Sequence, residues 1–293
     1  MLPVLVLTMM AGTFPAVQVP DAGPPAVAAG CALAETEPRP TPASLLPAAR
    51  LTLARCVQRD LEEGRWRDAD ARLATARRAG ALLRDADRRA WLGLVIRLEA
   101  TRHVDAGQWP TVMSLVLPNE DVLPWVGPLV RGVAAARASW ALQDAALQSR
   151  ARTELVRLEA LARLAGPLSA EEHARLLVQG AIAGAQYERD EMQLLLDAAH
   201  DLELRLMSGD ELQSPVVLAW ELEADLLRVT DRYAAASERY RDLLVEWPRR
   251  VQSRIALAGA YRRLGFAREA DETLAQARAL WVDADPEAQA LLR

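Results

Sequence analysis

The side chains best suited to acid–base chemistry near neutral pH are three histidines, His103, His173 and His200, which are scattered along the chain. The sequence contains no G-x-S-x-G nucleophile motif, no H-E-x-x-H zinc motif, no glycine-rich phosphate loop and no D-x-D-x-D-G calcium loop. We therefore expect a protein that is not an enzyme and that has no catalytic residue, no cofactor and no metal site.

Acidic neighbours of two histidines allow a sharper hypothesis. His173 follows Glu171 and Glu172, which suits proton exchange, but the same spacing fits the first turn of a helix, where carboxylates are stabilised by the helix dipole. We favour the helix interpretation. His200, close to Asp197, is likewise expected on a solvated helix face.

Two cysteines carry the remaining reactive groups, and neither belongs to a C-x-x-C motif or to a Cys/His cluster with metal spacing. Two cysteines cannot build a disulfide framework, so Cys56 is expected to be an ordinary buried residue. Cys31 differs, because Ala28-Ala29-Gly30-Cys31 resembles a bacterial lipobox, in which the cysteine becomes the lipidated first residue of the mature protein.

The amino-terminal segment has features of an export signal. Met1–Val19 carries no charged side chain, and Leu2–Met10 has the length of a signal-peptide apolar core rather than of a membrane span. Ala32-Leu33-Ala34 offers an A-x-A site for signal peptidase. No basic residue precedes the apolar run, and Asp21 and two prolines follow it, so a disordered extension of a cytosolic protein is the alternative.

Composition favours an all-α fold. The chain has 293 residues, of which 51% are hydrophobic but only 5% aromatic, so its apolar content is mostly Ala, Leu and Val. Ala and Leu are strong helix formers, and no strand-like alternation is found. A net charge of -5 and a pI near 5.4 argue against nucleic-acid binding. We divide the chain into a signal-like segment (1–30), a proline-rich linker (31–46) and a helical repeat domain (47–293), with no transmembrane span in the mature protein.

Arginine pairs are the other charged feature of the sequence. Acids are interleaved with them throughout, so we interpret them as partners of acids four residues away on the same helix rather than as a patch for anionic ligands. The pairs are Arg77-Arg78, Arg88-Arg89, Arg249-Arg250 and Arg262-Arg263.

A repeat becomes visible when Val217–Arg250 is placed over Val251–Ala284, an offset of 34 residues. Small and apolar positions coincide, which predicts two successive copies of one structural unit. The matching pairs are Ala224 with Ala258, Ala236 with Ala270, Leu227 with Tyr261, Tyr240 with Leu274 and Leu243 with Ala277.

These positions resemble the tetratricopeptide repeat, whose signature reads W-x2-L-G-x2-Y, then A-x3-F, then P. The chain has Trp220-x2-Glu223-Ala224-x2-Leu227, then Ala236-x3-Tyr240, then Pro248. Glu223 stands in place of Leu, and in the next unit Arg254 replaces the first aromatic residue. The resemblance implies antiparallel helix pairs that stack into a superhelix with a concave side.

The rest of the body has the turns and helix lengths of the same architecture. Gly64 and Gly107 each precede a tryptophan by two residues, as at a turn between paired helices, and Pro110 and Pro118 limit the helix after Gly107 to about two turns. Ser169–Glu172 forms a capping box that opens another helix. We expect about six hairpins in a solenoid, with two longer helices over 125–164 and a short terminal helix capped by Asp285. The tryptophans are interpreted as core.

In tetratricopeptide proteins one stripe of the first helix in each pair lines the concave groove that takes up a partner peptide. Acidic residues occupy this stripe here, where the subgroup that captures chaperone carboxyl termini has Lys and Asn. We expect a protein or peptide partner with basic and apolar residues, a merely solvated inner face being the alternative. The stripe comprises Leu218, Glu221, Asp225, Arg228, Gln252, Ile255, Gly259 and Arg262.

The functional expectation combines the repeat with the amino terminus. It is a non-enzymatic protein–protein interaction scaffold, exported to the periplasm or anchored as a lipoprotein at the outer membrane, in a bacterial cell-envelope assembly. The alternatives are a cytoplasmic adaptor that binds a peptide or signalling protein, and an accessory subunit of an enzyme.

Overall fold

The computed structural model describes residues 31, 46–209 and 215–293, and every regular element in them is a helix. The all-α prediction is confirmed for this part of the chain. The signal-like segment 1–30, with its apolar run, and residues 32–45 of the predicted linker lie outside the described residues.

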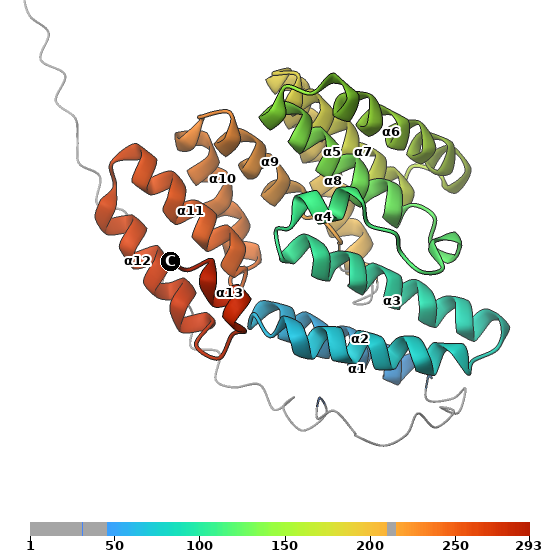
Figure 1. Cartoon of the computed structure of the whole chain (residues 1–293). Helices are drawn as coiled ribbons and strands as arrows, with labels where there is room; N and C mark the ends of the chain where they lie inside the picture. The colour runs from blue at the N-terminus through green and yellow to red at the C-terminus, as the bar shows by residue number, and fades with distance from the viewer. Residues whose placement is uncertain (1–30, 32–45, 210–214) are drawn as a thin grey trace, which may run out of the picture.

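The described helices pack in consecutive pairs, with short turns inside each pair (Figure 1). Within each pair two antiparallel helices bury a shared apolar stripe, and the helix lengths predicted over 125–164 are observed. The pairs are α1 (Leu46–Glu62) with α2 (Trp66–Ala81), α3 (Asp85–Asp105) with α4 (Trp109–Met113), α5 (Val126–Leu142) with α6 (Ala145–Ala165), α7 (Ala170–Ala185) with α8 (Arg189–Gly209), α9 (Ala219–Val229) with α10 (Tyr233–Glu246), and α11 (Val251–Leu264) with α12 (Ala267–Leu280). A 3₁₀ turn, η3 (Glu120–Val122), and a short helix near the carboxyl end, α13 (Pro286–Ala290), are the other regular elements in the described residues.

The turn between the two helices of each pair contains one residue with positive φ. Glycine supplies this conformation in three pairs, as predicted for Gly64 and Gly107, but in the other three a glutamine, a tyrosine and an aspartate adopt it. Such a residue lets the chain reverse while its amide groups bond back to the last carbonyls of the first helix, as Phe266 N does to Tyr261 O. The six turn residues are Gly64, Gly107, Gln143, Tyr187, Asp231 and Gly265.

Predicted helix starts are only partly confirmed. Ser169 caps α7 as expected, because its hydroxyl accepts a 3.1 Å hydrogen bond from the backbone N–H of Glu172. The helix after Gly107 is shorter than predicted, since α4 has five residues. Asp285 precedes α13 but makes no side-chain cap to it. Its carboxylate instead accepts a 2.7 Å hydrogen bond from the backbone N–H of Arg67, in the first turn of α2.

The last helices return to the first hairpin (Figure 1). Trp281 donates its indole N–H to the Glu62 carbonyl (2.9 Å), and Asp285 N–H donates to the Gly64 carbonyl (3.0 Å). The Trp281 ring meets Trp66 edge to face at 5.9 Å, within one cluster that draws on both ends of the fold. The segment that contains Trp281 and Ala288 therefore covers one end of α1 and α2, although these helices are distant in sequence.

The two departures from the repeat signature are buried charges that have found partners. Glu223 is fully buried and pairs with Arg239 at 2.7 Å, while the Arg239 guanidinium lies over the Trp220 ring. Burial raises the pKa of the Glu223 carboxyl, against the attraction of Arg239. Arg254 donates to the Pro248 carbonyl. Each of these buried polar side chains therefore has at least one hydrogen-bond partner in the fold.

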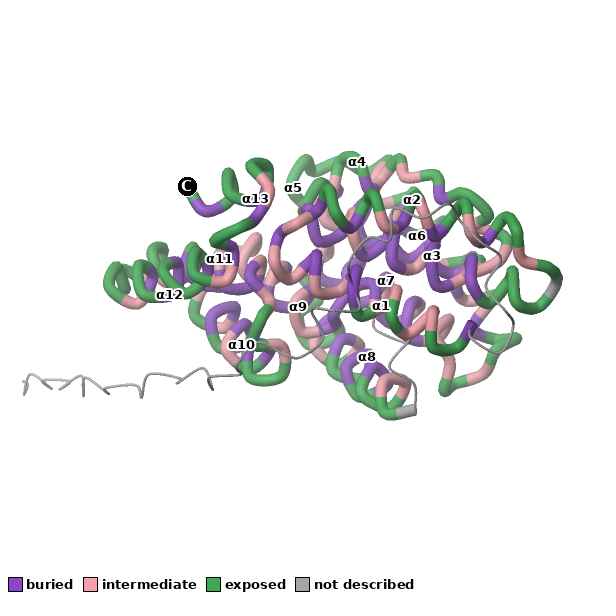
Figure 2. The backbone as a smooth tube through the Cα atoms, turned by 90° about the horizontal axis from the view of Figure 1, so that it is seen from below, coloured by how far each residue is buried: buried purple, intermediate pink, exposed green. Residues whose placement is uncertain are grey.

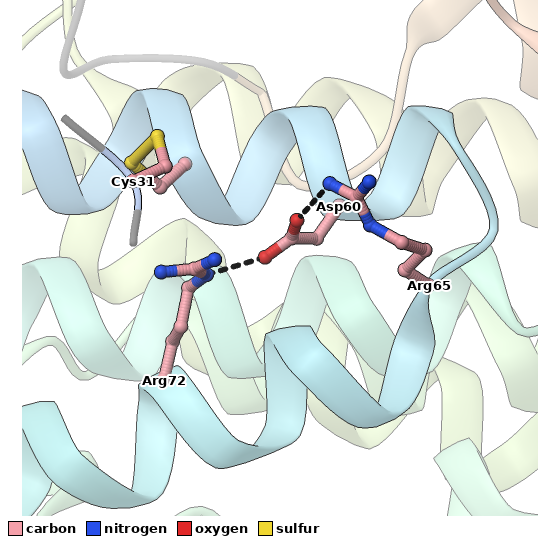
Figure 3. The surroundings of a disulfide bond; sticks show 5 residues. Cys31, Asp60, Arg65 and Arg72 are labelled. Carbon is pink, nitrogen blue, oxygen red and sulfur yellow. Dashed lines mark hydrogen bonds and ion pairs between the residues drawn. A yellow bond between two sulfur atoms is a disulfide. The ribbon is translucent and has the colours of Figure 1, made fainter. Parts of the chain in front are cut away.

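Cys56 is not an ordinary buried residue, and the expectation that it would be is wrong. It forms a disulfide with Cys31, with their Cα atoms 5.6 Å apart, on the side of α1 near Asp60 (Figure 3). Cys31 and Cys56 are both only 3% exposed. Asp60 itself pairs with Arg65 at 2.6 Å and with Arg72 at 2.5 Å, so it joins α1 to α2 beside the disulfide (Figure 3).

Buried residues lie on the inner sides of the helices, and exposed residues lie on the outer sides (Figure 2). In the described part of the chain, none of the helices has both the length and the apolar character needed for crossing a bilayer.

The close approach at Gly64 predicts a specific sensitivity. Gly64 has φ +70°, and an added Cβ would lie 2.7 Å from the Ala284 Cβ, whereas Gly265, with φ +85°, has nothing within 4 Å. Placing Ala in this left-handed conformation costs about 1–2 kcal/mol at either site. At Gly64 the collision adds about 1–3 kcal/mol.

Denaturant unfolding of Gly64→Ala and Gly265→Ala measures the difference. We expect Gly64→Ala to lose clearly more free energy of unfolding than Gly265→Ala. Equal losses would show that the carboxyl-terminal segment does not pack closely against the first hairpin at Gly64.

Candidate functional site

A cavity of about 720 Å³ lies between two walls of the fold. One wall comes from the end of α3, from α4 and from α5; the other comes from α9, α10 and α11. The walls belong to hairpins far apart in sequence, and the pairing of consecutive helices curves the chain so that these hairpins face each other (Figure 1). A hollow of this size is in the range of ligand and peptide side-chain pockets.

Six residues of the predicted stripe line this cavity: Glu221, Asp225, Arg228, Gln252, Ile255 and Gly259. Two do not. Leu218 is the residue before α9 and is buried on another side of that helix, against a smaller cavity beside Trp247. Arg262 is half exposed and lies 3.5 Å from Asp271, outside the cavity. The spacing of the stripe thus correctly located the inner faces of α9 and α11. Its first and last residues, Leu218 and Arg262, lie outside the cavity.

Asp225 is the centre of one charge network in the cavity wall. Its carboxylate lies 2.7 Å from Arg137 of α5 and 3.5 Å from Arg228, and it accepts a hydrogen bond from the hydroxyl of the fully buried Tyr240. Burial alone would raise the pKa of Asp225, but the charges of Arg137 and Arg228 outweigh it and lower that pKa. Asp225 therefore stays ionised and fixes side chains from both walls.

Glu221 takes part in a second network, centred on Arg250. The Arg250 guanidinium lies 2.7 Å from Glu221 and 2.6 Å from Asp105 at the end of α3, and Ser253 donates to Glu221 at 2.5 Å. Burial alone would lower the pKa of Arg250, but the two carboxylates outweigh it and raise that pKa. This network also joins the two walls.

The predicted acidic stripe is therefore not available as an acidic surface. Both carboxylate oxygens of Glu221 accept hydrogen bonds from Arg250, one of them also from Ser253. One oxygen of Asp225 accepts from Tyr240, and the other forms an ion pair with Arg137. A basic partner residue would have to displace an arginine that is already in place and partly desolvated. The electrostatic argument for a partner with basic residues depended on free carboxylates, and these carboxylates are already paired.

The aromatic face of the cavity was not foreseen from the sequence. Trp109 was interpreted as core, but it lines the cavity with the Arg137 guanidinium stacked 4.4 Å from its ring centre. Trp140 and Tyr233 line it as well, and the Arg263 guanidinium carbon lies over the Tyr233 ring, 5.2 Å from its centre. The spacing of Gly107 and Trp109 predicted a turn. The repeat alignment did not extend to this part of the chain, so the sequence did not indicate that the turn lies opposite α9 and α11.

The histidines do not lie in this cavity. His200 was expected on a solvated helix face, and this is wrong: it is 5% exposed and stacks on Trp220 with ring centres 3.6 Å apart. His173 is also buried, 3.5 Å from Glu203, whose carboxylate accepts from the backbone N–H of Ala219 at the start of α9. No three His, Cys, Asp or Glu side chains are placed to hold a metal ion in the residues that the structure describes.

The arginine pairs were expected to bind acids four residues away on the same helix, and several of them instead connect different helices. Arg77 of α2 pairs with the buried Glu99 of α3, and Arg249 lies 3.0 Å from Glu62 of α1. Burial raises the pKa of the Glu99 carboxyl, against the attraction of Arg77. The arginines thus serve contacts between helices, which sequence spacing alone does not reveal.

The Asp225 network predicts a large and pH-dependent stability effect. Asp225→Asn leaves Arg137 and Arg228 without their carboxylate, and breaking a buried pair costs about 3–5 kcal/mol. Asp271→Asn, which removes the exposed partner of Arg262, should cost at most about 1 kcal/mol.

The pH dependence has a definite direction. Because the pKa of Asp225 is lowered on folding, its contribution is present above the unfolded pKa of about 3.9 and is lost as the pH falls below it. Unfolding free energies of wild type and Asp225→Asn should therefore differ at about pH 6 and converge toward about pH 3. A constant difference across this range would show that the carboxylate charge is not what holds the two walls.

Comparison with known proteins adds no homology to this geometry: no family model, no curated protein and no solved structure matches the chain. The function is accordingly inferred from the cavity, its charge networks and the disulfide.

Proposed function

We propose that the protein is a non-enzymatic interaction scaffold, a tetratricopeptide-like α-solenoid that is exported to the cell envelope and binds a segment of a partner protein in its central cavity. The observation that carries this proposal is the cavity between α3–α5 and α9–α11, whose lining includes six of the residues predicted for a partner groove. The repeat match at an offset of 34 residues, with its helix pairs, supports the repeat assignment.

The cavity has the properties of a preformed recognition site. Its arginines are held by carboxylates, and two of them are stacked on aromatic rings, so little side-chain freedom is lost when a ligand enters. Trp109, Trp140 and Tyr233 offer rigid apolar area, and Ile255 lies on the opposite wall from Trp109. We propose that the partner inserts an apolar or aromatic side chain here, since the carboxylates are already neutralised.

The disulfide supports export. Disulfides persist in oxidising compartments such as the periplasm and are rare in the reducing cytosol. Cys31 and Cys56 are the only cysteines of the chain, and both are in the bond. This favours the exported scaffold over a cytoplasmic adaptor, for which both thiols would be reduced.

Site-specific photocrosslinking in the native cell tests the binding site. A photoreactive phenylalanine analogue at Ile255, inside the cavity, should capture a defined partner protein, whereas the same analogue at Val245, which is 73% exposed and outside the cavity, should not. Equal capture from both positions, or none from Ile255, would contradict partner binding in the cavity.

Arginine variants then test the cavity wall with the captured partner. Arg228 lines the cavity and Arg262, at the equivalent position of the next unit, does not. We expect Arg228→Gln to weaken partner binding about tenfold and Arg262→Gln to leave it unchanged, as measured by calorimetry on variants with intact circular dichroism. The reverse order would place the partner on the outer surface.

Fractionation tests the export step separately. The protein should be recovered from the cell envelope with a shortened amino terminus and without free thiols. A chain that begins with Met1 in the cytosolic fraction, with two alkylatable cysteines, would refute export and favour the adaptor alternative.

A further inference from the structure

The Cys31–Cys56 disulfide restricts how the amino terminus can be processed. Cys31 is buried, and its disulfide partner on α1 follows 25 residues later, so a mature chain that contains this disulfide must keep Cys31 with its sulfur in the bond. The two processing sites predicted from the sequence both conflict with that requirement, each for a chemical reason.

Lipobox processing uses the same atom as the disulfide. It forms a thioether on the Cys31 Sγ before the chain is cut ahead of that residue, and a sulfur in a thioether has no valence left for a disulfide. One molecule therefore carries either the lipid on Cys31 or the bond to Cys56. In the structure the Cys31 Sγ is bonded to that of Cys56.

Cleavage at Ala32-Leu33-Ala34 conflicts in another way. The cut after Ala34 would remove Cys31 from the mature protein, so that Cys56 would remain as a single buried thiol on α1. An exported protein with an unpaired cysteine is exposed to mispairing with other thiols.

A third site satisfies both constraints. Ala26-Val27-Ala28 also has the A-x-A pattern of signal peptidase, and it is the one such triplet that precedes Cys31 in the sequence. Hydrolysis of the Ala28–Ala29 peptide bond would leave Ala29-Gly30-Cys31 as the new amino terminus. Cys31 would then be the third residue, and the disulfide would fasten the new terminus to α1.

We propose that the exported chain is cut between Ala28 and Ala29 and that Cys31 is then oxidised with Cys56, so that the mature protein carries no lipid on Cys31. This inference rests on the export part of the proposed function. In this oxidation the two thiols lose two electrons and two protons, and a protein disulfide of the oxidising compartment takes up both and becomes a dithiol by thiol–disulfide exchange.

Intact-mass measurement of the full-length gene product, purified from the native envelope through a carboxyl-terminal tag, tests this directly. Without reduction, we expect the mass of a chain from Ala29 to Arg293 less two hydrogens, with no alkylation by iodoacetamide. After reduction, two alkylations should appear. A chain that starts at Cys31 with a lipid mass, or at Glu35 with one free thiol, would overturn the inference.

Three variants separate the processing routes. Cys31→Ser should still be cut before Ala29, since the peptidase reads Ala26 and Ala28, whereas lipobox processing requires the cysteine and would leave the precursor uncut. Ala28→Asp should block the cut, and Ala34→Asp, the matched change at the competing triplet, should leave it unaltered. Normal processing of Ala28→Asp, or accumulated Cys31→Ser precursor, would overturn the proposal.

Failure of this inference and failure of export give different results. An exported chain with any first residue other than Ala29 overturns the cut site alone. A cytosolic chain that begins with Met1 overturns export as well, and with it the envelope part of the proposed function.

Discussion

Each helix pair in this protein buries one apolar face inside itself and leaves another uncovered, and the fold depends on covering that second face. Along the chain the next pair does so. After α12, the segment that leads into α13 and α13 itself cover the end of the first hairpin, through Trp281, Asp285 and Ala288. The backbone hydrogen bond from Asp285 to Gly64 fixes this contact where a side chain on Gly64 would prevent it.

Buried ion pairs set the distance between the walls of the cavity. Arg137 with Asp225, and Arg250 with Asp105 and Glu221, each join α3 or α5 to α9 or α11. Such pairs add little net stability compared with apolar packing, but removing one member leaves an unpaired charge, so the arrangement is strongly specified. The acidic side chains of the cavity wall are therefore already paired with arginines of the protein itself.

The disulfide ties the chemistry of the amino terminus to the folded domain. A residue that the sequence associates with a membrane anchor is part of the core beside α1, next to the Asp60 pairs with Arg65 and Arg72 (Figure 3). Because one sulfur atom cannot serve both purposes, the disulfide and a lipid on Cys31 exclude each other in one molecule.

The sequence by itself determined the features that depend on near neighbours. Alanine and leucine content gave the helical class, the glycines at 64 and 107 marked turns, Ser169 marked a helix start, and the 34-residue offset located the inner faces of α9 and α11. Tertiary structure alone decided which distant groups meet: Trp109 and Arg137 with Asp225, Asp285 with Arg67, Cys31 with Cys56, and His200 with Trp220. Periodicity assigns a residue to a helix face, but the curvature of the stacked pairs determines what that face contacts.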